Sequence, residues 1–287
     1  MSLANKLALV GRDIGYSLSP EIHEFSAALM GIKASYKLID LEDHDLSELP
    51  QIVLKEKLLG FNITKPFKTD ICQVFDSSKN GSVNTAVFRD SSWKFYSTDF
   101  GGFYKALSRA SISLNRHRTI IFMGAGGSVS SIVDGIFSLS SKEELAVEKI
   151  YVQSRSQSFA VGKENWGTLN IVQKNLNPEV FGQLSKTNPA SLIIQCTPLP
   201  QQGDNLSAYS SMLERSFSGS LYDLTYSCDN MLLDRARDMG CKSADGLSML
   251  IEQALESQQI WWGRSAPYEK VFEHLQSVIG KKIRDEF

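Results

Sequence analysis

The stretch TIIFMGAGGSVSSIVDGIFSL, residues Thr119–Leu139, decides the fold class of this chain. Its first residues are apolar or β-branched and predict a buried strand, the glycines that follow predict a tight turn, and the remainder predicts a helix. Three further apolar runs, at residues 147–155, 190–197 and 219–226, are typical of strands, with helical segments between or after them. Alternating strands and helices predict an α/β fold with a doubly wound parallel sheet.

The glycine turn, Gly124-Ala125-Gly126-Gly127 followed by Ser128, lies between the predicted strand and the predicted helix. In that setting small residues let the backbone approach a pyrophosphate, and the helix N-terminus favours the anion. The pattern is G-x-G-G, because Val129 takes the third position of the strict G-x-G-x-x-G fingerprint. The position of the turn between a strand and a helix, more than its match to the sequence pattern, therefore predicts a Rossmann-like dinucleotide-binding unit.

The end of the next strand distinguishes between the two nicotinamide cofactors. A carboxylate there would hold the ribose hydroxyl of NAD and repel a 2′-phosphate. This chain has Ser154-Arg155-Ser156 instead, and a guanidinium between two hydroxyls suits a phosphate, which favours NADP. The competing interpretation is a solvated arginine at a strand end. Thr197, at the end of strand 190–197, is expected at the same carboxyl edge of the sheet as the glycine turn.

A second group of residues supplies an amine and a carboxylate. The run Phe61-Asn62-Ile63-Thr64-Lys65-Pro66-Phe67-Lys68 ends in a lysine, and Asp99 follows the segment 93–98. A lysine beside a carboxylate in one pocket can handle the proton of a hydroxyl group. The competing interpretation is two unrelated surface charges, because lysine and aspartate are mostly exposed in proteins.

The elements around this pair are short. Strands are expected at residues 7–11, 34–41 and 61–64, a helix at 20–30, and a hairpin of residues 82–90 and 93–98 that delivers Asp99 at its end. After Gly246 the chain is expected to be helical to its end. Lys68 therefore follows one strand, and Asp99 follows another.

Composition excludes several classes of function. The chain has 287 residues, 42% of them hydrophobic and 22% charged, which predicts an ordinary globular protein of two domains. Its 30 basic and 32 acidic residues are interspersed, so no basic field for nucleic acid is expected. Neither the four cysteines nor the four histidines have metal-ligand spacing. No segment reaches the roughly 18 consecutive apolar residues of a membrane span, so we expect a cytoplasmic protein.

Several short motifs together resemble those of the shikimate dehydrogenase family, over about residues 7–262. The specific ones are Ser17-Leu18-Ser19-Pro20 with His23, the run Asn62–Lys68, Ser82-Val83-Asn84-Thr85, and Thr98-Asp99 with Gly102. Less specific are the glycine turn, Gln195-Cys196-Thr197-Pro198, Tyr222-Asp223 with Tyr226, and Gly246 through Gln253 leading to Trp262-Gly263.

This resemblance implies an NADP-dependent oxidoreductase that reversibly reduces 3-dehydroshikimate to shikimate, a step in chorismate and aromatic amino acid biosynthesis. It makes Lys68 the catalytic lysine and Asp99 its partner. It implies that hydroxyl and amide side chains bind the substrate, namely Ser17, Ser19, Asn62, Thr64, Asn84, Tyr226 and Gln253. For NADP it implies the glycine turn with Ser128, the group Ser154-Arg155-Ser156, Thr197 and Gly246.

By the same resemblance we expect residues 1–101 and 248–287 to form an α/β substrate domain with a mixed sheet. Residues 102–247 are expected to form the Rossmann-like NADP-binding domain, inserted between those two parts. Ser17 and Ser19 would alternate to one face of an extended segment and grip the substrate carboxylate. The alternative for Ser19 is the N-cap of the helix that Pro20 opens. A monomer and a homodimer are both compatible with the sequence.

Some positions depart from the family pattern. Tyr16 stands where many members have histidine, Gln195-Cys196 replaces a common Asn-Ala pair, and Ser154 and Ser156 replace Asn and Thr. Such changes would shift cofactor affinity, or substrate preference toward quinate. Two alternatives therefore stay open. One is a quinate/shikimate dehydrogenase with relaxed use of NAD, and the other is a catalytically silent dinucleotide-binding regulator.

Overall fold

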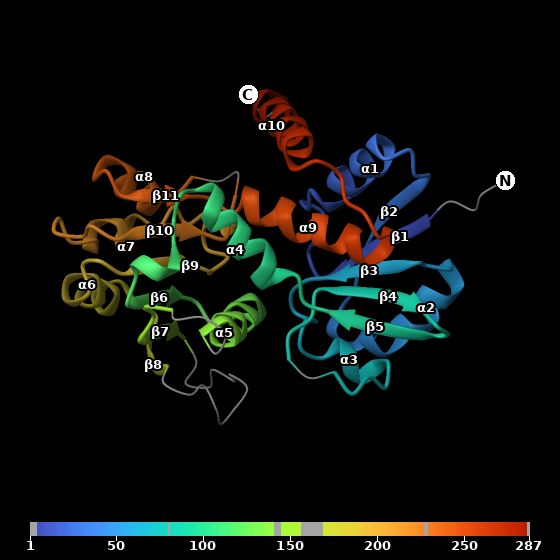
Figure 1. The fold of residues 1–287 in the computed structure, drawn as a ribbon, viewed down its shortest axis with the longest axis horizontal. Coiled ribbons are helices and arrows are strands. Elements are labelled where there is room, and N and C mark those ends of the chain that lie inside the picture. Colours follow the sequence, from blue (N-terminus) through green and yellow to red (C-terminus); the bar gives the residue numbers. More distant parts are fainter. Residues whose placement is uncertain (1–4, 80, 141–144, 156–168, 227–228, 286–287) are drawn as a thin grey trace. The chain divides into compact units, whose positions relative to one another are not determined.

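The computed structural model describes residues 5–79, 81–140, 145–155, 169–226 and 229–285 of the chain. The chain divides into two compact units. The first combines Met1–Gly102 with Leu250–Phe287, and the second is Phe103–Met249. Each unit contains one β-sheet with helices packed against it (Figure 1).

The first unit has a five-stranded mixed sheet in the order β2-β1-β3-β4-β5. Strand β1 pairs in parallel with β2 and β3, whereas β4 pairs antiparallel with β3 and β5. The strands are β1 Asn5–Gly11, β2 Ala34–Asp40, β3 Gly60–Ile63, β4 Thr85–Arg89 and β5 Ser92–Tyr96. This is the mixed sheet that the sequence predicted.

The two faces of this sheet build two apolar clusters, because successive residues of a strand point to opposite sides. Ala8 and Val10 pack with buried side chains of the helices on one face, and Leu7 and Leu9 pack with Trp261 on the other. The helices of this unit, two of which extend into the second, are α1 Ser19–Leu29, α2 Leu49–Glu56, α3 Ile71–Val74, α4 Asp99–Arg109, α9 Leu247–Trp262 and α10 Tyr268–Asp285, with a 3-10 turn η1 at Asp43–Glu48.

Strands β4 and β5 form the expected hairpin. The ladder runs from Thr85 opposite Tyr96 to Arg89 opposite Ser92. Asp90 and Ser91 close it with φ values of 52° and 59°, a left-handed pair typical of tight two-residue hairpin turns. The hairpin therefore leaves the segment before β4 and the start of α4 at the same end of the ladder.

The second unit has a six-stranded sheet in which every strand pair is parallel, in the order β11-β10-β9-β6-β7-β8. The strands are β6 Thr119–Met123, β7 Lys149–Ser154, β8 Asn170–Asn175, β9 Leu192–Gln195, β10 Ser220–Asp223 and β11 Lys242–Ala244. Apart from the half-buried Thr119 at the start of β6, strands β6, β9 and β10 are buried, as expected for a sheet covered on both faces.

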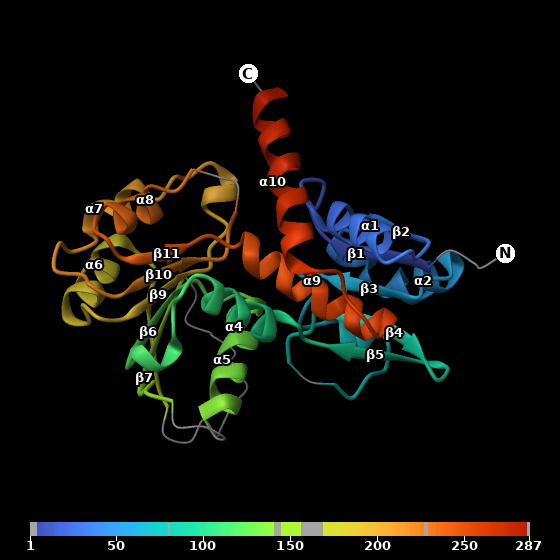
Figure 2. The same ribbon diagram turned by 45° about the horizontal axis from the view of Figure 1, so that its top comes forward.

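Helices cover both faces of this second sheet. Figures 1 and 2 show α6, α7 and α8 on one face and α5 on the other. Side chains of α6, α7 and α8, such as Phe181, Tyr209 and Leu232, pack on Ile121 and Ile193 of the sheet. The helices are α5 Gly127–Ser140, α6 Pro178–Thr187, α7 Ser207–Met212 and α8 Met231–Asp238, with 3-10 turns η2 Leu114–Arg116 and η3 Pro200–Gln202. The predicted doubly wound α/β fold class is thus confirmed.

Two features are absent from the described residues. None of their helices is long and apolar enough to cross a bilayer. No group of three or more His, Cys, Asp or Glu side chains among them is arranged to hold a metal ion.

Candidate active site

Lys68 and Asp99 form a buried ion pair in the first unit. Lys68 lies in the turn after β3, and Asp99 is the first residue of α4, at the end of the hairpin. The Lys68 Nζ donates to Asp99 Oδ2 at 2.7 Å, with side-chain exposures of 12% and 1%. The amide groups of the first helical turn also favour a carboxylate at that position. The structure thus holds an ammonium group at a fixed place near the surface.

Asn84 fixes the second carboxylate oxygen. Its Nδ2 donates to Asp99 Oδ1 at 2.9 Å and to Thr98 Oγ1 at 2.9 Å. Its Oδ1 accepts from the Thr98 backbone N–H at 2.8 Å. Asn84 precedes β4, and Thr98 follows β5, so these bonds join the two ends of the hairpin. Asn84 therefore orients Asp99 and, through it, Lys68.

Helix α9 brings Gln253 to the same place. Asn84 Nδ2 lies 3.3 Å from Gln253 Oε1. The helix approaches α4 closely because Gly102 has no side chain, and a Cβ there would lie 2.8 Å from the Gln253 backbone nitrogen. Four residues predicted from the sequence, Lys68, Asp99, Asn84 and Gln253, are therefore brought together.

This close approach gives a first prediction. Gly102→Ala is expected to lower the free energy of unfolding by about 1–3 kcal/mol, because the new methyl group forces α4 and α9 apart. If Gln253 has the substrate-binding role that the family resemblance implies, the change should also raise the KM for substrate by moving Gln253. Thermal melting and steady-state kinetics measure the two effects. The matched control is Gly280→Ala in α10, where a Cβ meets nothing within 4 Å; equal melting temperatures for the two variants would contradict the packing argument.

Asn62 continues the polar row on β3. Its Nδ2 lies within 3.0–3.1 Å of Asn84 O, Thr85 Oγ1 and Ser257 Oγ. Its Oδ1 accepts from the Tyr36 hydroxyl at 2.8 Å. Both polar atoms of the Asn62 side chain thus have protein partners, which fix its orientation.

Tyr36 links this row to the two serines, and sequence reasoning missed it. Burial raises the pKa of Tyr36 well above its usual value, and a hydrogen bond with Ser19 opposes that rise. The Tyr36 ring stacks on His23, with centroids 4.6 Å apart. Burial lowers the pKa of His23 to about 3, despite a hydrogen bond with Asn62. His23 is therefore neutral at physiological pH and supports Tyr36 by packing.

Ser17 and Ser19 converge, although not through an extended segment. Their Oγ atoms are 3.1 Å apart, and the Ser19 N–H donates to Ser17 Oγ at 3.2 Å. Leu18 between them has φ −86° and ψ 0°, a turn conformation that brings both hydroxyls to one side. The N-cap of α1 is Leu18. The extended-segment prediction and the Ser19 N-cap alternative were therefore both wrong.

The remaining predicted residue of the first unit is Thr64. It follows β3, its N–H donates to Val10 O at 2.9 Å, and it is half-buried. Its methyl group lies so close to Gly11 that a Cβ on that glycine would be 2.4 Å away. Lys65, the next residue, is exposed, and its Nζ lies 5.6 Å from the Tyr16 ring centroid.

In the second unit the glycine turn joins β6 to α5. Gly124 has φ +116°, a backbone conformation that strains other residues, and a Cβ there would lie in tight contact, 3.1 Å from the carbonyl carbon of Cys196. Gly126 is exposed, and a Cβ there would meet nothing within 4 Å. The turn therefore leaves open space at Gly126, directly before the start of α5 at Gly127. The first backbone amides of a helix have no acceptor within the helix itself.

Arg155 follows β7 at the same edge of the sheet. It is exposed, and the described part of the chain contains no carboxylate within ion-pair distance of it. Ser154 is buried, and its Oγ accepts from the Gln173 side-chain amide at 3.4 Å, so its hydroxyl is engaged inside the unit. Ser156, predicted to flank the arginine, lies outside the described residues.

Thr197 lies after β9 and has a buried hydroxyl for which the described residues offer no partner. Its N–H donates to Gln195 Oε1, and the Gln195 Nε2 donates to Thr197 O at 3.0 Å. A buried hydroxyl without a partner is costly. This atom is consistent with a ligand at the carboxyl edge.

Asp223 at the end of β10 is a second buried carboxylate, and sequence reasoning gave it no role. Its Oδ1 accepts from the Thr225 N–H and hydroxyl at 2.6 and 2.7 Å and from Gln195 Nε2 at 3.3 Å. Its Oδ2 accepts from Asn230, the N-cap of α8. These bonds fix both ends of the loop that carries Tyr226, which lines a cavity of about 220 Å³ in this unit.

This carboxylate gives a prediction about pH. Burial raises the pKa of Asp223 from 3.8 to about 6. The folded protein then binds more protons than the unfolded chain between these values, so the stability that Asp223 contributes is complete below pH 3.8 and is lost as the pH rises to about 6. Relative to Asp223→Asn, the wild type should lose about 3 kcal/mol of unfolding free energy over that window.

Denaturant titrations at pH 4.5 and pH 7 should detect about 2 kcal/mol of this loss, because the rest occurs below pH 4.5. The matched control is Asp229→Asn, an exposed carboxylate in the same loop. Its unfolding free energy should follow that of the wild type at both pH values. Parallel curves for the wild type and Asp223→Asn would contradict the prediction.

Gly246 has a packing role in this structure. A Cβ on it would lie 2.2 Å from Leu224 O, and its N–H donates to Thr225 O at 2.8 Å. Gly246 therefore lets the start of α9 approach the loop after β10.

Taken together, the second unit fits a dinucleotide. It offers an open glycine turn at a helix N-terminus, an exposed cation at the next strand end and a buried hydroxyl with no partner in the described residues.

The first unit also matches a family model. Residues 9–86 match the model for the shikimate dehydrogenase substrate binding domain. A relative from Clostridium botulinum, named shikimate dehydrogenase (NADP(+)), is 30% identical over 263 residues, covering 88% of this chain and 95% of that protein.

Solved structures have the same fold. A chorismate mutase/shikimate 5-dehydrogenase fusion protein from Clostridium acetobutylicum is 25% identical with a TM-score of 0.76, covering 97% of this chain and 99% of that chain. A shikimate 5-dehydrogenase from Thermus thermophilus, solved in complex with NADP(H) and shikimate, is 23% identical with a TM-score of 0.76, covering 95% and 99%.

Proposed function

Because this chain belongs to the shikimate dehydrogenase family, we propose that it catalyses the reversible, NADPH-dependent reduction of 3-dehydroshikimate to shikimate. This is a step in the synthesis of chorismate and the aromatic amino acids. The observation that carries the proposal is the buried Lys68–Asp99 pair at the end of a row of polar side chains.

Lys68 acts on the oxygen of the substrate carbonyl. As hydride reaches the carbonyl carbon, negative charge develops on that oxygen, and a fixed ammonium group stabilises it. Lys68 then delivers a proton to the oxygen, and solvent restores the proton to the lysine. In the reverse direction the same amine accepts the hydroxyl proton. Asp99, held by Asn84, keeps the ammonium group oriented.

The polar row provides the partners that a small polyhydroxylated carboxylate needs. Ser17 and Ser19 present two hydroxyls on one side of a turn, suited to the carboxylate group. Thr64, Asn84 and Gln253 are proposed to contact ring hydroxyls, with Asn62 held in place by its neighbours. Tyr226, which the resemblance also implies as a substrate contact, belongs to the second unit, and its role stays a prediction.

NADP is the proposed cofactor, held by the glycine turn and the start of α5 at its pyrophosphate and by Arg155 at its 2′-phosphate. When bound, it supplies or accepts the hydride. Thr197 offers it a buried hydroxyl. Ser154 contributes by shaping the strand end, since its own hydroxyl is turned inward.

The two units have separate proposed roles. The unit of Met1–Gly102 with Leu250–Phe287 binds substrate, and Phe103–Met249 binds NADP. The predicted boundaries, 1–101 with 248–287 and 102–247, stay predictions for these roles. The cytoplasmic location and the choice between monomer and homodimer also stay predictions.

A spectrophotometric assay tests the activity. Purified protein is offered shikimate or quinate, each with NADP or NAD, and formation of reduced cofactor is followed. We expect the highest kcat/KM for shikimate with NADP. A higher value for quinate, or equal values for NAD and NADP, would replace the proposal by the broader quinate/shikimate activity. No turnover with any of the four pairs would support a non-catalytic regulator.

A further inference from the structure

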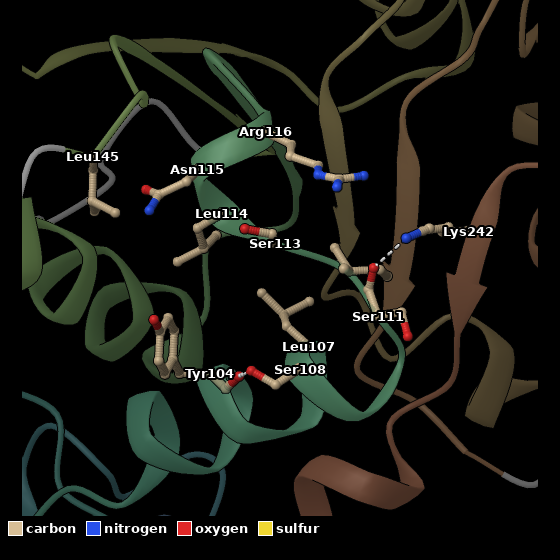
Figure 3. A pocket seen from close by; sticks show the side chains of 11 residues that line it. Tyr104, Leu107, Ser108, Ser111, Ser113, Leu114, Asn115, Arg116, Leu145 and Lys242 are labelled. Atoms are coloured by element: carbon tan, nitrogen blue, oxygen red, sulfur yellow. Dashed lines mark hydrogen bonds between the residues drawn. The ribbon is translucent and has the colours of Figure 1, made fainter.

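A second pocket lies in the unit Phe103–Met249, away from the glycine turn. It is a cavity of about 350 Å³, lined by the last turns of α4, by η2, by Leu145 ahead of β7 and by the start of β11 (Figure 3). We call it the basic pocket and define it by Tyr104, Leu107, Ser111, Leu114, Arg116 and Lys242.

The basic pocket lies at the amino-terminal edge of the parallel sheet. Arg116 precedes β6 by three residues, and Lys242 is the first residue of β11. The glycine turn follows the opposite end of β6. The five residues of β6 span about 16 Å, so the basic pocket and the glycine turn lie at opposite ends of that strand. A ligand in the basic pocket therefore leaves the dinucleotide position free.

The floor of this pocket is apolar, and its rim is polar. Leu107 and Leu114 are 1% and 3% exposed, and the Tyr104 ring is 40% exposed beside them. Ser111, Ser113 and Asn115 provide hydroxyl and amide groups, and no carboxylate is among the lining residues. A pocket of this size and lining suits a small molecule with a compact apolar body and one charged group.

The charge of the rim is positive. The Lys242 Nζ donates to the Ser111 backbone carbonyl at 2.6 Å, and its ammonium group forms no ion pair within the described residues. Arg116 is exposed and likewise has no carboxylate partner in that part of the chain. Arg116 and Lys242 both line the pocket, from η2 and from the start of β11 (Figure 3). Two like charges held this way repel each other, and a bound anion would relieve the repulsion.

The negative end of the α4 dipole offsets the positive charge of Arg116 and Lys242 only in part. Ser111 follows the carboxyl terminus of α4, which carries about −0.5 of an elementary charge. Lys242 binds the Ser111 carbonyl just beyond this helix end, but two full positive charges exceed that partial charge. The surplus favours a dianion, and the planar guanidinium of Arg116 suits two oxygens of a phosphate.

We propose that the basic pocket binds a small phosphate monoester whose apolar or aromatic body rests on Leu107, Leu114 and Tyr104, with its phosphate between Arg116 and Lys242. This site is independent of substrate and NADP binding in the proposed reaction. A carboxylate with the same apolar body is the competing ligand chemistry.

Phenyl phosphate is the test probe, added to the full chain in the presence of excess NADP, which occupies the glycine turn. Calorimetry should show one saturable site, with benzoate and inorganic phosphate each binding at least about tenfold more weakly because one half of the recognition is missing. In two-dimensional NMR of the wild type, the backbone amides of Ser111 and Arg116 should shift, and that of Gly126 should not.

Two variants separate the charges from the fold. Arg116→Gln alone leaves the Lys242–Ser111 hydrogen bond intact and should weaken phenyl phosphate binding about tenfold or more. The matched control, Lys186→Gln with Arg215→Gln, removes two exposed charges of the same unit outside the pocket and should bind as the wild type does. No saturable binding, shifts confined to Gly126, equal losses in the control, or tighter binding of benzoate would each overturn the proposal.

Discussion

Lys68→Ala is expected to lower kcat for shikimate oxidation by about 10²- to 10⁴-fold, the usual range for loss of a positioned acid or base. The KM for shikimate should change much less, because the ammonium group acts mainly on charge that develops during the reaction. Steady-state kinetics with purified protein measures both constants. Undiminished turnover would rule out the role proposed for this lysine.

The matched control is Lys65→Ala. Lys65 lies three residues earlier in the same loop but is exposed and faces Tyr16. Its removal should leave kcat within about twofold, as expected for a surface charge. The Lys68 variant also leaves Asp99 buried without its cation, which destabilises a protein by about 3–5 kcal/mol. Assays are therefore run well below the melting temperature of that variant, and circular dichroism checks its fold.

Arg155→Asp is expected to raise the KM for NADPH about 100-fold, because charge-assisted bonds to the 2′-phosphate are lost and a like charge faces it. The KM for NADH should change by less than about threefold, since NADH has no phosphate there. The ratio of the two values is the decisive measurement. Equal losses for both cofactors would overturn the assignment of Arg155.

Arg215→Asp serves as the control for that charge reversal. Arg215 is an exposed arginine of the same unit that precedes β10, outside the glycine turn. The same change in net charge at this position should leave both KM values near those of the wild type. No rise is expected, because exposed charges separated by more than a Debye length are largely screened. A rise in the KM for NADPH in this control would indicate that net charge, and not a local contact of Arg155, sets NADPH affinity.

The sequence predicted all five strands of the first unit and the four inner strands of the second, but not β8 and β11. The predicted strands carry continuous or alternating apolar residues, which is a direct signal of burial. Strand β8, Asn170–Asn175, is mostly polar and half-exposed at one edge of the sheet, and β11 has only three residues at the other edge. Edge strands need less apolar surface, so they leave a weaker pattern.

In the candidate site, too, some residues were predictable from the sequence and others were not. The spacing of Lys68 and Asp99 on either side of a predicted hairpin was enough to expect one pocket. The partners that orient them were not predictable, because they come from distant parts of the chain. Asn62 bonds Ser257, which lies 195 residues later, and the Tyr36 link between Ser19 and Asn62 depends on which face of β2 is turned inward. Such contacts arise from packing and carry no local signal.

The β4–β5 hairpin has a practical consequence for labelling this protein. At the end of the hairpin near Asp99, the Asn84 N–H donates to Tyr96 O and the Asn84 Oδ1 accepts from the Thr98 N–H. The turn at Asp90 and Ser91 lies at the opposite end of the ladder. A fluorophore or a short peptide tag attached at this turn would disturb only the neighbouring strand pair, Arg89 and Ser92. The turn is therefore a suitable labelling site, because the remaining strand pairs of the hairpin still hold Asp99 at its distance from Lys68.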